Sequence, residues 1–188
     1  MTRISYVDEN KLSGEARAMV MEYAPYVTNI RRVVGHAQKL GPLYIQLGQK
    51  FMSGSAFDPR LRQLGILLAC QLTGCEYEWR LHIPNSKRVG VPDEQISLIE
   101  SGGWRESASF NEREKLVLEF ISNYYAKPSI EAEMLERLKS SFSEEEILEM
   151  FIGFGFIFSL IKIMLSVDLD IDEFAGKKYI RKDEAGST

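Results

Sequence analysis

The residues of this chain that are best suited to chemistry lie in one short segment, CEYEWRLH at positions 75–82. At about 100° per residue of an α-helix, Cys75, Glu78 and His82 project within roughly one third of the circumference. Glu78 and His82 are at positions i and i+4, so their side chains can touch. Cys75 falls in the first turn, where unpaired N–H groups and the helix dipole favour a thiolate. We therefore expect the three side chains to share one hollow and to perform proton transfer or thiol chemistry.

The same segment has other interpretations. Cysteine is commonly buried as a small apolar residue, and a Glu–His pair at this spacing can be only an ion pair. A metal could take Cys75, Glu78 and His82 as ligands, but the HExxH pattern is absent and no fourth ligand lies nearby. His36 could approach from another helix, although a lone histidine is more often structural. The sequence thus predicts neither a metal nor a cofactor.

Helical patterns surround the segment, with no hairpin or βαβ signal, so we expect one all-α domain over residues 1–188. The expected helices cover residues 14–23, 30–40, 43–52, 60–73, 75–90, 92–101, 112–125 and 130–138, followed by a last apolar helix. Asp58-Pro59 marks the start of one helix and Gly74 its end. Pro84 removes the hydrogen bond to the carbonyl of residue 80, so its helix should kink or split there. The tail after about residue 174 should fray.

Composition and charge exclude several classes of protein. Lys and Arg number 23 against 27 Asp and Glu, and this net charge of −4 argues against a nucleic-acid partner. The most apolar run, Met150–Ile161, falls short of the ~18 residues of a membrane span, so we expect a core helix, or one also covered by a second subunit. Two cysteines cannot form a disulfide framework, and the first residues lack the apolar stretch of a signal peptide. We expect a cytoplasmic protein with no membrane partner.

Two stretches, PRLRQL at 59–64 and TGCEYEW at 73–79, combine with His82 and Gly90-Val91 into a recognisable pattern. This pattern resembles the carboxymuconolactone decarboxylase family, which shares its fold with the alkyl hydroperoxidase D (AhpD) proteins. The resemblance extends over roughly Arg3–Val167. It implies an AhpD-like helical fold that assembles as dimers, trimers or hexamers, with the site near a subunit boundary.

The resemblance also implies roles for single residues. In the peroxidase branch the pattern is Glu, then Cys-x-x-Cys, then His, and these positions fall on Gln63, Cys75, Glu78 and His82. Glu78 cannot act as the second thiol, and Gln63 can hydrogen-bond but cannot relay a proton as a carboxylate would. Cys70 could replace the missing thiol if its Cα lies within ~4.4–6.8 Å of that of Cys75. The alternative is that Cys70 is a buried core residue.

Three functions remain open. The leading one is a decarboxylase-like lyase or isomerase that acts on a small carboxylated or lactone-like molecule. In it His82 would shuttle a proton, Glu78 would orient or share it, Gln63 would hold a substrate oxygen, and Cys75 would be a supporting polar group or a thiolate. The first alternative is an AhpD-like thiol peroxidase, with peroxiredoxin-type activity, that uses Cys75. The second is a non-catalytic binding or assembly protein on the same fold.

Overall fold

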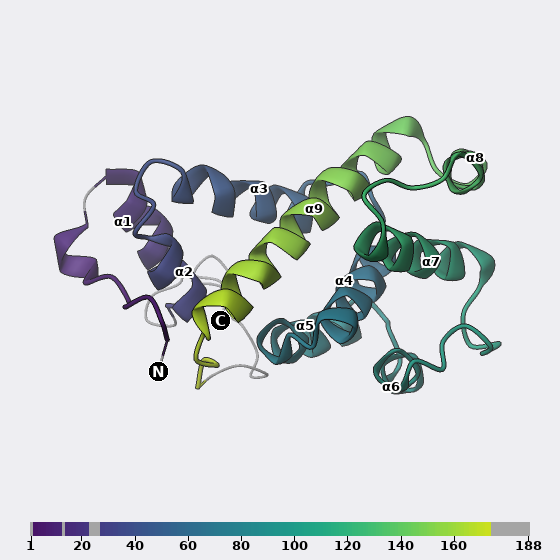
Figure 1. The fold of residues 1–188 in the computed structure, drawn as a ribbon, viewed down its shortest axis with the longest axis horizontal. Helices are drawn as coiled ribbons and strands as arrows, with labels where there is room; N and C mark the ends of the chain where they lie inside the picture. Colours follow the sequence, from purple (N-terminus) through teal and green to yellow (C-terminus); the bar gives the residue numbers. More distant parts are fainter. Residues whose placement is uncertain (1, 13, 23–26, 174–188) are drawn as a thin grey trace, which may run out of the picture.

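The computed structural model describes residues 2–12, 14–22 and 27–173, and in these residues the chain is helical and contains no strand. The expected all-α class is therefore confirmed, and the tail expected to fray after residue 174 lies outside the described residues. A short 3-10 helix, Glu9–Lys11, precedes the α-helices shown in Figure 1. Their bounds are α1 Gly14–Met21, α2 Asn29–Val34, α3 Gly41–Ser53, α4 Pro59–Thr73, α5 Glu76–Arg88, α6 Asp93–Ser101, α7 Glu112–Ala126, α8 Ala132–Lys139 and α9 Glu144–Val167.

Helix α4 forms the centre of the fold, because it packs against α5, α6, α7 and α9. Figure 1 shows α9 crossing the molecule diagonally, and α3 also packs on it. Two glycines allow this close approach to the phenylalanines of α9. A Cβ built on Gly65 of α4 would lie 2.5 Å from the ring of Phe154, and one on Gly48 of α3 would collide with the ring of Phe156. Any larger residue at either position would push α9 away.

Helix α9 is longer than the apolar run read from the sequence. Ser143 and Glu146 form the expected capping box at its start, and the helix has 24 residues. Among the described helices it is long and apolar enough to cross a membrane. One such helix is weak evidence for a membrane span, since a core helix of a soluble protein has the same properties. Its buried side chains include Phe154 and Ile161, which lie in the hydrophobic core.

The local signals around the candidate segment specify α4 and α5. Asp58 caps α4 by accepting hydrogen bonds from the first N–H groups of the helix, and Pro59 occupies its first turn. Gly74 ends α4 in a left-handed conformation at φ +68°. Cys75 is the N-cap of α5, and the helix runs through Pro84 to Arg88, so of the expected kink or split at Pro84 the split does not occur. Helix α2 is shorter than expected: it ends at Val34, and residues 35–40 form turns and a bend.

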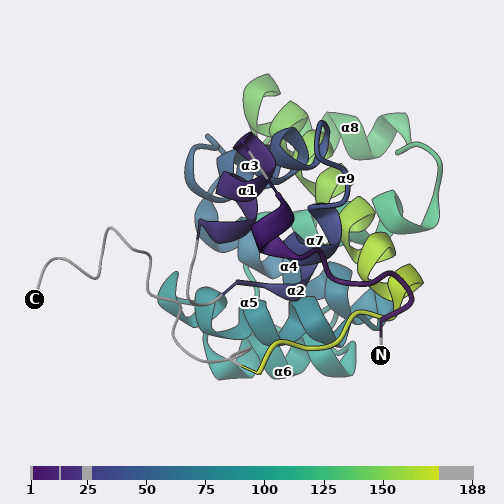
Figure 2. The ribbon, with the colours of Figure 1, turned by 90° about the vertical axis from the view of Figure 1, so that its left-hand side faces the viewer.

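The two ends of the described chain lie side by side and fix α2 against α5 (Figure 1 and Figure 2). The N–H of Arg3 donates to the carbonyl of Val167 at 2.6 Å. Asp172, which follows α9, accepts a hydrogen bond from the hydroxyl of Tyr77 in α5 and one of 2.9 Å from the N–H of Asn29 in α2. Burial raises the pKa of Tyr77 well above its usual value, and the charge of Asp172 adds to the effect. The neutral hydroxyl therefore stays available as the donor.

Candidate active site

Helices α4 and α5 run antiparallel, and this pairing brings three of the residues singled out in the sequence together. The guanidinium of Arg60, at the start of α4, donates from Nε to the carbonyl of Gly90, just after α5, at 3.3 Å. One turn further along α4, Gln63 Oε1 lies 2.8 Å from His82 Nδ1. On the other side of the imidazole, His82 Nε2 lies 3.0 Å from Glu78 Oε2. The i, i+4 contact expected from the sequence is present, and it continues across to a second helix.

The hydrogen-bond partners of His82 determine where its protons lie. An amide oxygen can only accept, so Nδ1 of His82 carries a hydrogen and donates it to Gln63. Nε2 faces a carboxylate, which also accepts unless it is protonated. A hydrogen on Nε2 would point at Glu78, so this contact can hold a proton between the imidazole and the carboxylate. Both side chains are largely shielded from water, at 8% and 4% exposed.

Ser86 extends this row of polar groups and was missed in the sequence. Its hydroxyl donates to the carbonyl of His82 at 2.8 Å and lies 3.4 Å from Gln63 Oε1. The signal was available, because Ser86 follows His82 by the same i, i+4 step that joins Glu78 to His82. The buried hydroxyl contributes to fixing the position of Gln63, and thereby the orientation of the imidazole.

Glu78, His82 and Gln63 open onto a pocket of about 420 Å³. This volume falls in the range of ~300–1,000 Å³ that is typical of small-molecule sites. The pocket is walled by side chains from α2, α3, α4, α5 and α9. Its apolar residues are Ile30, Ile45, Met52, Pro59, Leu81, Val89, Phe156, Ile157 and Leu160. Its other polar residues are Arg31, Gln49, Arg62, Asn85 and Arg88.

Cys75 does not share this pocket, which corrects the expectation of a common hollow. Its side chain is 1% exposed and belongs to the hydrophobic core. Burial raises the pKa of the Cys75 thiol to about 11, and the backbone N–H groups of Glu78 and Tyr77 offset only part of the effect. Burial therefore opposes the thiolate expected at the helix start, because desolvation outweighs the favourable field of the helix end.

The local backbone explains why the sulfur is buried. The N–H of Cys75 donates to the carbonyl of Cys70 at 3.0 Å across the turn at Gly74. In this kind of helix ending, the residue after the turn packs against the last turn of the helix. Cys70 is also buried, and burial raises the pKa of its thiol well above the usual value. Both cysteines are free thiols, so no disulfide joins Cys70 to Cys75 in this structure.

The structure does not support two other features considered for the site, a contribution from His36 and a metal ion. His36 does not approach Cys75, because its Nε2 pairs with the carbonyl of Ser5 at 2.7 Å. In the part of the chain that the structure describes, no cluster of three or more His, Cys, Asp or Glu side chains is arranged to hold a metal ion.

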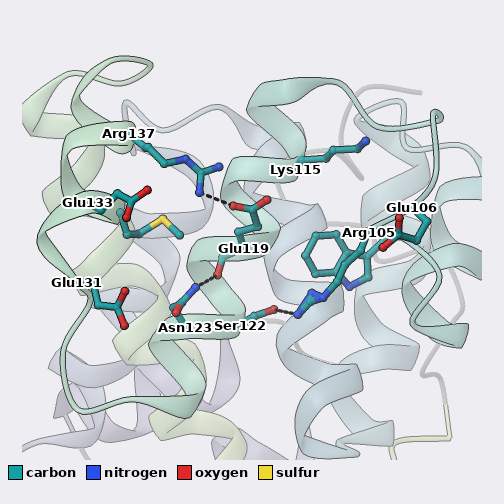
Figure 3. Close-up of a pocket in the computed structure, with 11 residues that line it drawn as sticks. Arg105, Glu106, Lys115, Glu119, Ser122, Asn123, Glu131, Glu133 and Arg137 are labelled. Atoms are coloured by element: carbon teal, nitrogen blue, oxygen red, sulfur yellow. Dashed lines mark hydrogen bonds and ion pairs between the residues drawn. The ribbon is translucent and has the colours of Figure 1, made fainter.

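A second hollow, of about 540 Å³, lies between α7, α8 and the loop at residues 104–106 (Figure 3). Its charged groups are engaged with one another or face solvent. Arg137 forms an ion pair of 2.7 Å with Glu119, and Arg105 donates to Ser122 at 3.3 Å. The guanidinium of Arg105 also lies over the buried ring of Trp104. Because these charged groups are partly or fully exposed, the hollow has none of the shielded polar groups that line the pocket at His82.

Comparison with known proteins agrees with the observed fold. Residues 38–122, just under half of the chain, match the model of the Carboxymuconolactone decarboxylase family. No curated protein matches the chain.

Several solved structures share the fold. A peroxidase-related protein from Ralstonia eutropha JMP134, described as an alkylhydroperoxidase AhpD core, has a TM-score of 0.79 at 12% identity, over 96% of this chain and 98% of its own. A peroxidase-related protein from Silicibacter sp. TM1040 has a TM-score of 0.78 at 15% identity, over 95% and 96%. A protein of unknown function from Agrobacterium tumefaciens, with a proposed role as antioxidant defence protein AhpD, has a TM-score of 0.64 at 23% identity, over 71% and 91%.

Proposed function

We propose that the chain is a member of the carboxymuconolactone decarboxylase/AhpD-like superfamily and an enzyme of the decarboxylase-like kind, which the family match over residues 38–122 and the shared fold support. It would use His82 and Glu78 for proton transfer on a small carboxylated or lactone-like molecule. The observation that carries this proposal is the imidazole held between Gln63 and Glu78 at the wall of a pocket. Such a shared proton can be given up or taken back with little movement of the heavy atoms.

The chemistry of decarboxylation fits these groups. When the bond between the carboxylate and its neighbouring carbon breaks, carbon dioxide leaves and the electron pair stays on that carbon as an enolate. The proton shared by His82 and Glu78 would then pass to that carbon and restore a neutral product. The amide nitrogen of Gln63 makes no hydrogen bond to any described residue, so it can donate to the oxygen on which negative charge develops.

Variants of the two histidines test this function. We expect the purified protein to turn over some muconolactone-type acids, and His82→Ala to lower the rate by about 10²–10⁴-fold, the usual contribution of a general acid–base group. His36→Ala is the matched control, because that imidazole is exposed and pairs only with a backbone carbonyl of the described chain. A folded His82→Ala protein with the wild-type rate would refute the assignment.

A thiol peroxidase is the competing function, and the names of the structural neighbours favour it. It would need Cys75 as a thiolate that peroxide can reach. The burial of Cys75 and its raised pKa weigh against this role. A non-catalytic binding protein would need no shared proton, so the pairing of His82 with Glu78 weighs against that alternative.

We also propose that the protein works as a homo-oligomer in the cytoplasm. Large apolar side chains are exposed on α3 and α9, which pack against each other: Leu43, Leu47, Leu148, Ile152 and Leu165. A second copy that covers them would remove this apolar surface from water. Light scattering of the purified protein should give a mass at least twice that of one chain. The two free thiols fit a reducing compartment.

A further inference from the structure

Arg62 is a buried cation without a matching anion. The side chain lines the pocket, and the residue is only 5% exposed. It donates from one terminal nitrogen to the carbonyl of Phe57 at 3.2 Å and from the other to the carbonyl of Met52 at 2.9 Å. Its Nε is buried and has no acceptor among the described residues. Of the three guanidinium nitrogens, Nε is therefore left without an acceptor in the described chain, and the group as a whole lies over the ring of Phe51.

The acids around Arg62 are committed to other groups. Asp58 caps α4 by accepting from the N–H groups of Arg60 and Leu61. Glu149 accepts from the hydroxyl of Ser55 and the N–H of Phe57. In the described chain neither carboxylate forms an ion pair with Arg62, although both lie close enough to act on its charge. Burial lowers the pKa of Arg62, and the charges of Asp58 and Glu149 offset only part of this effect.

The remaining charges of the pocket leave an excess of positive charge. Arg31 is paired with Glu22 at 2.8 Å. Glu78, the one acid among the lining residues, is occupied by His82. Arg88 lines the pocket, is exposed, and forms no ion pair with any described residue. Two guanidinium groups that line the pocket, one buried and one exposed, are thus available to interact with an anion that enters it.

Arg62 lies in the first turn of α4, and Arg88 is the last residue of α5. These two helix ends are adjacent, because Arg60 reaches the carbonyl of Gly90. Arg88 follows His82 by six residues, which is ~9 Å along a helix axis at about 1.5 Å per residue. A small molecule can therefore span from the guanidinium groups to the imidazole.

We propose that Arg62 and Arg88 bind a carboxylate of the substrate and so hold its reacting carbon at His82 and Glu78. This inference rests on the proposed function and deepens it, because it assigns the carboxylate recognition to two residues. A carboxylate can accept two parallel hydrogen bonds from one guanidinium and so supplies the anion that Arg62 lacks. A lactone or ketone without a carboxylate leaves that charge uncompensated and binds more weakly.

Matched acid and neutral probes test the proposal by calorimetry. The probes are 5-oxotetrahydrofuran-2-carboxylate with its methyl ester, and benzoate with benzamide. We expect the wild type to bind at least one acid more tightly than its neutral partner. Arg88→Gln should weaken binding of that acid about 3–10-fold, and Arg62→Lys, which keeps the charge but loses the planar fork, about 10–100-fold. Arg17→Gln removes an exposed charge away from the pocket and should change nothing.

The outcomes separate this inference from the proposed function. If Arg62 serves only to hold the carbonyls of Met52 and Phe57, Arg62→Lys will bind acid and neutral probe in the wild-type ratio, and the proposal is overturned. Equal binding of acid and neutral probe by the wild type overturns it as well. Arg88→Gln lies at an exposed position, so a failure of Arg62→Lys to fold still leaves a decisive measurement. If acid binding depends on the arginines but no acid is turned over, the inference stands and the decarboxylase function is rejected. If turnover is unchanged in both arginine variants, the decarboxylase function stands and the inference is rejected.

Discussion

Alkylation of Cys75 measures directly whether the protein performs thiol chemistry or proton-transfer chemistry. The variant Cys70→Ala leaves Cys75 as the only thiol in the chain. With a pKa of about 11 against an ordinary value of 9.0, about one thiol in a thousand is ionised at pH 8, instead of about one in ten. Ionisation alone should therefore slow the reaction with iodoacetamide about 100-fold relative to the urea-unfolded chain, and the burial of the sulfur should slow it further.

The pH dependence of this reaction provides the refutation. In the folded protein the rate should rise about tenfold per pH unit until it approaches pH 11, since only the thiolate reacts. The alkylation rate of the unfolded chain should level off near pH 9, and this reaction is the control for the activity of the reagent. A folded protein whose rate is half-maximal at pH 9 or below would show that Cys75 is a reactive thiol. The peroxidase would then become the better function.

The same raised pKa predicts a loss of stability at high pH. Because the folded state holds the neutral thiol, its contribution is fully present below about pH 9 and is lost as the pH rises toward 11. A difference of about two units corresponds to about 3 kcal/mol at most. Urea unfolding of Cys70→Ala with and without Cys75→Ala should show the stability difference between the two proteins shrinking over this range. A difference that stays constant from pH 8 to 11 would contradict the raised pKa.

Three further substitutions test the packing that supports the site, each by urea unfolding. Gly65→Ala places a Cβ against the ring of Phe154 and should cost about 1–3 kcal/mol, whereas an unchanged midpoint would mean that α9 can shift freely. Tyr77→Phe leaves the buried carboxylate of Asp172 without its hydroxyl donor and should cost about 1–3 kcal/mol; a neutral effect would show that this contact does not hold α2 to α5. Asn111→Ala removes the cap of α7 and should cost about 1 kcal/mol, with Asn111→Ser near wild type as control.

The helix class and the ends of several helices were accessible from the sequence because their causes are local. Asp58 with Pro59, and Asn111 with its capping box, act within one turn of chain, so residue type and spacing are sufficient to predict them. The contact of Glu78 with His82 belongs to the same group, since i, i+4 neighbours on a helix meet whatever surrounds them. The passage of α5 through Pro84 shows the limit, because a proline inside a helix removes one hydrogen bond and yet this helix continues to Arg88.

The sequence by itself determined which side chains could do chemistry and that they would stand on helices. Only the tertiary structure decided which of them share a pocket: it brought Gln63 across to His82, buried Cys75 in the core, and buried the Nε of Arg62 without an acceptor. Desolvation and charge compensation depend on every element packed around a group. Helix periodicity places a thiol at a helix start, but neighbouring helices decide whether water reaches it.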